Sequence, residues 1–239
     1  MKCIVCIPTY NEMENIERII DAVHASVPDI HVLVIDDGSP DGTANLVRNR
    51  MSTDNRIHLL ERRGKLGLGT AYCEGFQYAL SQGFELILQM DADFSHDPKE
   101  LPKFINAASD HDLIIGSRYI SGVNVINWPM SRLLLSWFAN AYTRTITGMP
   151  IADATGGFKC FRAEMLRKIN IGAIKSNGYA FQIEMNYRMW RLKSRIAELP
   201  IIFMDRVSGT SKMSKNIVFE AAFLVWKLKL ITIFTLGKK

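Results

Sequence analysis

Short apolar runs recur along this chain, each followed by a loop and a helical pattern, and they constrain its fold more than any other feature. The runs lie at residues 4–7, 31–35, 57–60, 86–90 and 113–116, and each reads as a strand buried on both faces. After the first run, Ile16, Ile19, Ile20 and Val23 recur at helical spacing. Strands that alternate with helices predict an α/β fold whose central sheet is mostly parallel, flanked by helices and joined by right-handed crossovers.

The expected helices follow from local signals. Asn11 is predicted to cap the first helix, with Glu14 reaching back to it. Further helices are expected at about residues 43–51, 70–80, 101–108 and 178–193. Phe181, Met185 and Met189 on the last of these are expected in the core. Glu184 on the same helix is expected either to face a substrate or to form a surface ion pair.

Length and composition favour one domain. A chain of 239 residues, 48% hydrophobic and 22% charged, can bury one sizeable core, and neither a linker nor an internal repeat interrupts it. The predicted division is a catalytic domain over residues 1–215 and an amphipathic C-terminal helix over residues 216–239.

The N-terminal apolar stretch at residues 4–7 is too short for a signal peptide, which predicts a cytoplasmic protein. The four cysteines fit a reducing compartment. Cys3 and Cys6 lie three apart in a strand, so their side chains point to opposite faces, and both are expected to be small buried hydrophobes.

The net charge of +5 is moderately basic, but the charges are spread and no basic stripe with interleaved aromatics appears. Nucleic acid is therefore not expected as a partner. Phosphate-bearing small molecules or an anionic membrane surface explain the balance.

Polar clusters follow every predicted strand, and in parallel sheets ligands bind at these carboxyl ends. Asp91 and Asp93 come directly after the fourth strand. Taken alone, this pair reads as ordinary turn residues. Within a shared site, two carboxylates suit Mg²⁺ or Mn²⁺, since Mg²⁺ commonly takes one or two carboxylates together with substrate phosphates. His96 is a weaker metal candidate, because imidazole is uncommon for Mg²⁺.

The loop after the first strand does not contain the pattern G-x-G-x-x-G, which disfavours a dinucleotide-binding site.

A family resemblance rests on motifs spread over nearly the whole chain. They are IPTYNE at residues 7–12, DDGSPDGT at 36–43, KLGLGTAY at 65–72, MDAD at 90–93, GSRY at 116–119, DR at 205–206 and SK at 211–212. Together these motifs resemble the dolichol-phosphate (polyprenol-phosphate) mannosyltransferases of glycosyltransferase family 2. The resemblance implies an inverting glycosyltransferase of the GT-A fold.

The resemblance also implies roles for individual residues. The donor, GDP-mannose, is expected at Pro8, Tyr10, Glu12, Ile35, Asp37, Asp91, Ala92, Asp93, Arg118, Arg206 and Lys212. The metal is expected at Asp91, Asp93 and Ser95, although Ser95 stands where some family members place Gln. Asp93, Arg118 and Arg206 are the expected catalytic residues. Arg118, Arg132 and Ser136 are expected at the phosphate of the lipid acceptor.

The chemistry depends on the acceptor. A lipid phosphate is already largely anionic near neutral pH, because its second pKa lies near ~6, and it needs no general base. A sugar hydroxyl would need a general base, and Asp153 is then the candidate. The alternative is that Asp153 only stabilises the glycine-rich turn in which it lies.

Two segments suggest a membrane surface. Residues 128–147 predict a helix with a broad apolar face, on which Arg132 and Ser136 lie four apart, and the resemblance makes residues 123–150 an interfacial segment. Residues 217–236 are strongly apolar but broken by Glu220, Lys227 and Lys229, unlike a spanning helix. This second segment is expected to pack on the core, to lie in the membrane plane, or to dock a small membrane-anchoring protein.

The sequence thus predicts metal-assisted transfer of mannose from GDP-mannose to a polyprenyl phosphate, by a protein peripherally bound to the cytoplasmic membrane face. Two alternatives stay open. One is the same chemistry with another donor, such as UDP-glucose. The other is a nucleotide-sugar binding module without turnover.

Overall fold

The computed structural model describes residues 1–205 and 222–230. Its centre is a seven-stranded sheet in the order β3-β2-β1-β4-β7-β5-β8. The strands are β1 (Cys3–Thr9), β2 (His31–Asp36), β3 (Ile57–Glu61), β4 (Leu86–Gln89), β5 (Leu113–Ser117), β7 (Lys159–Arg162) and β8 (Ile196–Pro200). Every pairing is parallel except those of β7, which runs antiparallel between β4 and β5. The prediction of a mostly parallel sheet is confirmed.

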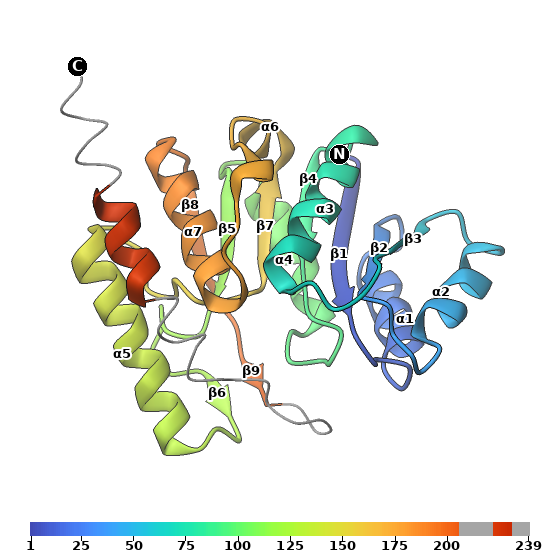
Figure 1. The fold of residues 1–239 in the computed structure, drawn as a ribbon, viewed down its shortest axis with the longest axis horizontal. Coiled ribbons are helices and arrows are strands. Elements are labelled where there is room, and N and C mark those ends of the chain that lie inside the picture. Colours follow the sequence, from blue (N-terminus) through green and yellow to red (C-terminus); the bar gives the residue numbers. More distant parts are fainter. Residues whose placement is uncertain (206–221, 231–239) are drawn as a thin grey trace.

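Helices cover both faces of this sheet (Figure 1). They are α1 (Ile16–Ser26), α2 (Thr43–Met51), α3 (Leu68–Ser81), α4 (Leu101–Ala107), α5 (Met130–Thr147), α6 (Ala163–Leu166) and α7 (Gly178–Arg191). A separate two-stranded ribbon pairs β6 (Val125–Ile126) with β9 (Phe203–Met204) in parallel.

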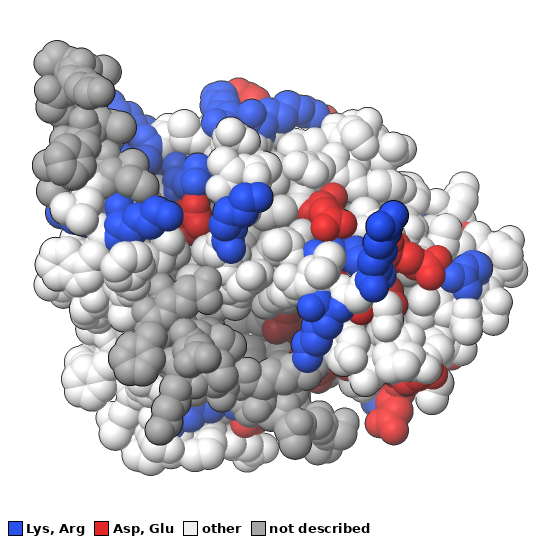
Figure 2. All heavy atoms as spheres, in the orientation of Figure 1, with Lys and Arg blue, Asp and Glu red and all other residues white. Residues whose placement is uncertain are grey.

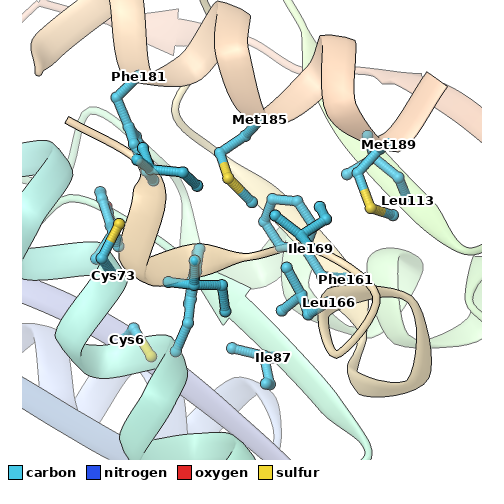
Figure 3. Close-up of a cluster of buried hydrophobic side chains, with 14 of the residues drawn as sticks. Cys6, Cys73, Ile87, Leu113, Phe161, Leu166, Ile169, Phe181, Met185 and Met189 are labelled. Atoms are coloured by element: carbon cyan, nitrogen blue, oxygen red, sulfur yellow. The ribbon is translucent and has the colours of Figure 1, made fainter. Parts of the chain in front are cut away.

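Alternation along the strands builds two cores. Val5 and Ile7 of β1 face α1, α2 and α4, whereas Ile4 and Cys6 face α3 and α7. The second core is shown in Figure 3, where Phe181 and Met185 of α7 pack toward the sheet. Phe181, Met185 and Met189 are fully buried, as predicted, and Cys3 and Cys6 are buried free thiols.

The first helix begins later than predicted. Its first residue is Ile16, and Asn11 lies before it in a left-handed conformation, with φ of 59°. The backbone N–H groups of Asn11 and Glu12 donate to Ser39 Oγ and Thr43 Oγ1, at 3.0 and 3.1 Å. The prediction that Asn11 caps the helix was wrong, because this loop is held by the turn after β2.

The C-terminal part of the chain supports the core-packing interpretation over residues 222–230, which are helical. Val225 and Leu228 are buried in the core shared with α7, while Phe223 and Trp226 are exposed. The hydroxyl of Tyr142 on α5 donates to the carbonyl oxygen of Ala222 at 3.2 Å. The predicted domain boundary at residues 215 and 216 lies outside the described residues. Within the two described ranges, no helix combines the length and apolar character needed to cross a membrane.

Candidate active site

The carboxyl ends of β1 and β2 form one side of the candidate site. Thr9 Oγ1 donates to Asp36 Oδ1 at 2.9 Å, and the backbone N–H of Asp37 donates to the Thr9 carbonyl oxygen at 3.0 Å. Asp37 forms a buried ion pair with Arg62, which the sequence analysis did not single out. Burial raises the pKa of Asp37, and the Arg62 charge opposes this shift. Through Arg62 the Asp37 carboxylate is tied to the loop after β3.

The other predicted donor residues of this region have different surroundings. The ammonium group of Lys65 lies 4.6 Å from the centre of the Tyr10 ring. Glu12 Oε2 accepts a hydrogen bond of 3.0 Å from Asn15 Nδ2. Pro8 and Ile35 are neighbours in the sheet. Ile35 is fully buried in the core, so this predicted donor residue has no accessible surface in the structure.

The turn after β4 carries the two predicted metal carboxylates. Asp91 and Asp93 are half-buried, while Ala92, Ser95 and His96 are buried. Phe94 adopts a left-handed conformation with φ of 61°, which costs about 1–2 kcal/mol for a bulky residue. The turn is held by a hydrogen bond of 3.0 Å from the Ser95 backbone N–H to Asp93 Oδ1. Strain kept in place by such contacts is typical of functional loops.

His96 orients this turn rather than offering a ligand. Its Nδ1 accepts a hydrogen bond of 3.1 Å from the backbone N–H of Asp91, and its ring stacks on Phe158 at 4.9 Å. Burial lowers the pKa of His96, although the nearby carboxylates oppose the shift. The neutral ring therefore has Nδ1 as an acceptor and carries its proton on Nε2.

The turn fits a hard divalent cation. The described part of the chain contains no cluster of three or more His, Cys, Asp or Glu side chains that could hold a metal by themselves. Asp91 and Asp93 would thus supply two carboxylates and leave the remaining positions to water and substrate phosphates, as Mg²⁺ prefers. Ser95 Oγ is buried without a hydrogen-bond partner beside them, and a ligand bound at this turn could satisfy it.

Arg118, at the end of β5, is bound to Asp153. Its Nε and Nη2 donate to the two carboxylate oxygens, each at 2.7 Å, and Nη2 also donates to Thr155 Oγ1 at 2.8 Å. Burial alone would raise the pKa of Asp153, but the Arg118 charge and hydrogen bonds offset this and hold it below the ordinary value. Asp153 is consequently an ionised partner of Arg118, and its oxygens are occupied, which disfavours the role of general base.

Arg132 and Ser136 lie on α5, as predicted. Arg132 Nη1 forms an ion pair of 2.7 Å with Asp205, and Ser136 Oγ accepts a hydrogen bond of 2.7 Å from the Tyr119 hydroxyl. Both residues line a mostly apolar cavity of about 320 Å³ between α5, α7 and residue 222. The other lining residues are Trp128, Leu135, Phe138, Ala139, Tyr142, Thr143, Thr155, Tyr179 and Ile183.

Two further expectations have separate outcomes. Glu184 forms an ion pair of 2.6 Å with Arg188 and accepts from Ser176 Oγ at 2.6 Å, but its side chain is only 8% exposed. The expected ion pair of Glu184 is therefore confirmed, although the Glu184 carboxylate is buried and not at the surface.

Two other predicted donor residues, Arg206 and Lys212, lie outside the described residues.

Comparison with known proteins places this arrangement in a family. The sequence profile named "Glycosyl transferase family 2" matches residues 4–170, which include the turn with Asp91 and Asp93 and the Arg118–Asp153 pair. The chain belongs to glycosyl transferase family 2. It is a glycosyltransferase, and the predicted GT-A fold is confirmed.

Two curated relatives of this glycosyltransferase match it along most of its length. An undecaprenyl-phosphate mannosyltransferase from Micrococcus luteus is 44% identical, with 92% of this chain and 91% of the relative covered. A polyprenol monophosphomannose synthase from Mycolicibacterium smegmatis is 45% identical, with 94% and 85% covered. The predicted relationship to polyprenol-phosphate mannosyltransferases is confirmed.

Solved structures share the fold of the glycosyltransferase. Glucosyl-3-phosphoglycerate synthase from Mycobacterium tuberculosis, in complex with Mn²⁺, uridine diphosphate and phosphoglyceric acid, superposes with a TM-score of 0.70 at 16% identity. That match covers 95% of this chain and 78% of the other. The same enzyme with Mg²⁺ and uridine diphosphate gives 0.68 at 18% identity, over 95% and 79%.

Proposed function

We propose that this glycosyltransferase moves mannose from GDP-mannose to a polyprenyl monophosphate at the cytoplasmic face of a membrane, with Mg²⁺ or Mn²⁺ at the donor diphosphate. The observation that carries the proposal is the apolar cavity with Arg132 and Ser136 in its wall. An apolar cavity suits a prenyl chain, and a guanidinium with a hydroxyl suits its phosphate. The names of the two curated relatives support the same acceptor and sugar.

Arg118 connects the acceptor and donor parts of the proposed site. Its guanidinium lies 5.4 Å from the centre of the ring of Trp128, which lines the cavity. Arg118 directly follows β5, and Asp91 follows β4 at the same edge of the sheet. Because Arg118 stays charged beside Asp153, it can shield the two anionic substrates from each other. Arg206 and Lys212 complete the proposed cationic set around the donor phosphates.

The transfer step needs no proton acceptor. A phosphate oxygen of the lipid forms a bond to the anomeric carbon of mannose, while the bond from that carbon to the GDP oxygen breaks with inversion. The acceptor oxygen is already anionic, and GDP leaves with the electron pair. Asp153, whose oxygens are taken by Arg118 and Thr155, is not required as a base.

The metal site would be built from the turn after β4. Asp91 and Asp93 would hold the ion, Ser95 is the nearby hydroxyl, and His96 fixes the Asp91 backbone. A bound divalent cation supplies charge stabilisation to the departing diphosphate. The protein supplies orientation, because the strained turn fixes both carboxylates before the donor binds.

Membrane contact is proposed through α5 and residues 222–230. Exposed apolar side chains gather there, namely Met130, Leu134, Leu135, Trp137, Phe138, Tyr142, Phe223, Trp226 and Leu230. In Figure 2 the edge of the molecule over α5 is mostly uncharged, while basic and acidic side chains are interspersed elsewhere on that face. Aromatic residues next to lysines are typical of membrane interfaces, and Lys227 and Lys229 follow Trp226 within the second segment.

The test is a transfer assay on the purified chain with Mg²⁺ or Mn²⁺ and radiolabelled GDP-mannose or UDP-glucose. We expect labelled lipid with GDP-mannose and polyprenyl phosphate, and none with polyprenol, which lacks the phosphate. Label transferred from UDP-glucose alone would refute the donor assignment. Binding of nucleotide sugar without transfer to any acceptor would favour a binding module.

A further inference from the structure

Trp128 occupies a position beside the cavity that neither the sequence motifs nor the family resemblance explained. It lies just before α5, and its ring contacts Phe203 of β9 edge-to-face at 5.5 Å. The Arg132 guanidinium lies over the same ring at 4.2 Å and the Arg118 guanidinium at 5.4 Å. One aromatic ring thus contacts both cations proposed for the acceptor phosphate, and cation–π attraction keeps them close despite their like charges.

Two donors at this place lack partners. Trp128 Nε1 and Arg132 Nε are both buried and make no hydrogen bond, although both residues line the cavity. A buried N–H without an acceptor costs about 1–3 kcal/mol, so two in adjacent side chains indicate an acceptor that arrives with a ligand. Arg132 already donates to Asp205 through Nη1, and its Nε belongs to the other edge of the guanidinium.

We propose that Trp128 is a phosphate-binding residue of the acceptor site. Its indole N–H and the Nε–H of Arg132 bind the phosphate group of the acceptor, while its ring spaces the Arg118 and Arg132 guanidiniums. This assignment rests on the proposed function, because it takes the phosphate to be that of a prenyl phosphate in the apolar cavity.

The two orphan donors near Trp128 suit a ligand group with several acceptor oxygens. Arg118 is paired with Asp153 and Arg132 with Asp205. A phosphate has three acceptor oxygens, so it can accept from both orphan donors while these ion pairs remain.

The first test compares KM values for a soluble acceptor, geranyl phosphate, in wild type and Trp128→Phe. The variant keeps an aromatic ring for packing but loses the N–H. We expect the acceptor KM to rise about tenfold, the value of one hydrogen bond to a charged group, with the donor KM unchanged. The control is Trp190→Phe at the far end of α7, which should change neither KM. An unchanged acceptor KM in Trp128→Phe overturns the proposal.

The second test needs no turnover. The chain has four tryptophans, and a protein labelled with ¹⁵N at the indoles gives a resonance for Trp128 that is assigned by its absence in Trp128→Phe. Geranyl phosphate should move this indole proton resonance downfield, and geraniol, which lacks the phosphate, should not. A Trp128 resonance that stays fixed while other resonances shift at saturation refutes the assignment.

The two tests separate this proposal from the proposed function. If the Trp128 resonance shifts with geranyl phosphate but no mannose is transferred, the phosphate site stands and the assigned reaction fails. If mannose is transferred but the resonance and the acceptor KM do not respond, the reaction stands and the role of Trp128 fails.

Discussion

The backbone N–H of Asp91 donates a hydrogen bond of 3.1 Å to Nδ1 of His96, whose ring is buried between Phe158 and Phe203. This bond closes the turn on which both candidate metal carboxylates lie. It also fixes the tautomer of His96, because Nδ1 must remain without a proton.

Replacing His96 tests whether this bond orients the metal site. His96→Leu should lower kcat/KM by about 10–100-fold, as expected when an outer-shell partner of a metal ligand is lost. His96→Asn loses the same ring but keeps an acceptor at the position of Nδ1, so it should retain more activity. Steady-state kinetics at varied Mn²⁺ concentration measure the effect. Equal losses in the two variants would mean that the ring packing, and not the hydrogen bond, matters.

Asp93→Ala should abolish turnover and leave the fold intact. Asp93 is half-buried and is not part of the hydrophobic core, and the hydrogen bond that is lost to the Ser95 backbone is worth about 1 kcal/mol. Transfer assays and thermal unfolding of the same preparation provide the measurement. Near-normal activity in this variant would refute Asp93 as a metal ligand.

The Arg118–Asp153 pair should contribute to stability as well as to catalysis. Both side chains are nearly inaccessible, at 6% and 0% exposure, so Asp153→Ala leaves a buried, unpaired guanidinium and should cost about 3–5 kcal/mol in urea unfolding. Adding Arg118→Met should restore part of this free energy but no activity. The exposed pair Arg48–Glu61 is the control, since Glu61→Ala should cost less than about 1 kcal/mol.

The sequence predicted the parts of this molecule that depend on local pattern. The apolar runs located five strands, and the polar residues after them located the site, because parallel strands bring their carboxyl ends to one edge. It did not predict the antiparallel β7, which has only four residues with a charged residue at each end. Nor did it predict that Arg118 pairs with Asp153, 35 residues away, since a long-range ion pair leaves no periodic signal. Trp128 was seen only as the start of an apolar helix, because an orphan donor is visible only in three dimensions.

A histidine pair at the opposite edge of the sheet predicts a pH-dependent stability. His31 Nδ1 and His58 Nε2 lie 2.9 Å apart, and His58 Nδ1 lies 3.1 Å from the Tyr78 hydroxyl, so the network needs neutral rings. Burial, followed by nearby positive charges, lowers the pKa of both residues below 6.5. Below pH 6.5 the unfolded chain therefore binds more protons than the folded one.

The stability that this pair contributes is thus fully present above pH 6.5, and it is lost as the pH falls through the lowered pKa values of His31 and His58 in the folded chain. Urea unfolding between about pH 7.5 and about pH 5.5 should show a falling free energy of unfolding. His58→Phe keeps a ring beside Tyr78 and Phe84 but removes one titrating group, so its free energy should fall less steeply. An equal slope in the variant would assign the effect to other groups.

The exposed apolar face of α5 should direct the protein to membranes. Leu134 and Trp137 are 48% and 49% exposed and lie outside the cavity wall, so changing both to Glu should spare the acceptor site but oppose insertion into lipid. In liposome flotation, wild type should float with vesicles, more strongly when they contain anionic lipid, because Lys227 and Lys229 lie near the same surface. The double variant should float much less while keeping its activity on geranyl phosphate. Met51→Glu on α2, an exposed apolar residue on another helix, is the matched control and should float like wild type. If wild type ignores lipid altogether, the apolar face of α5 has another partner, since side chains this exposed are not part of the core.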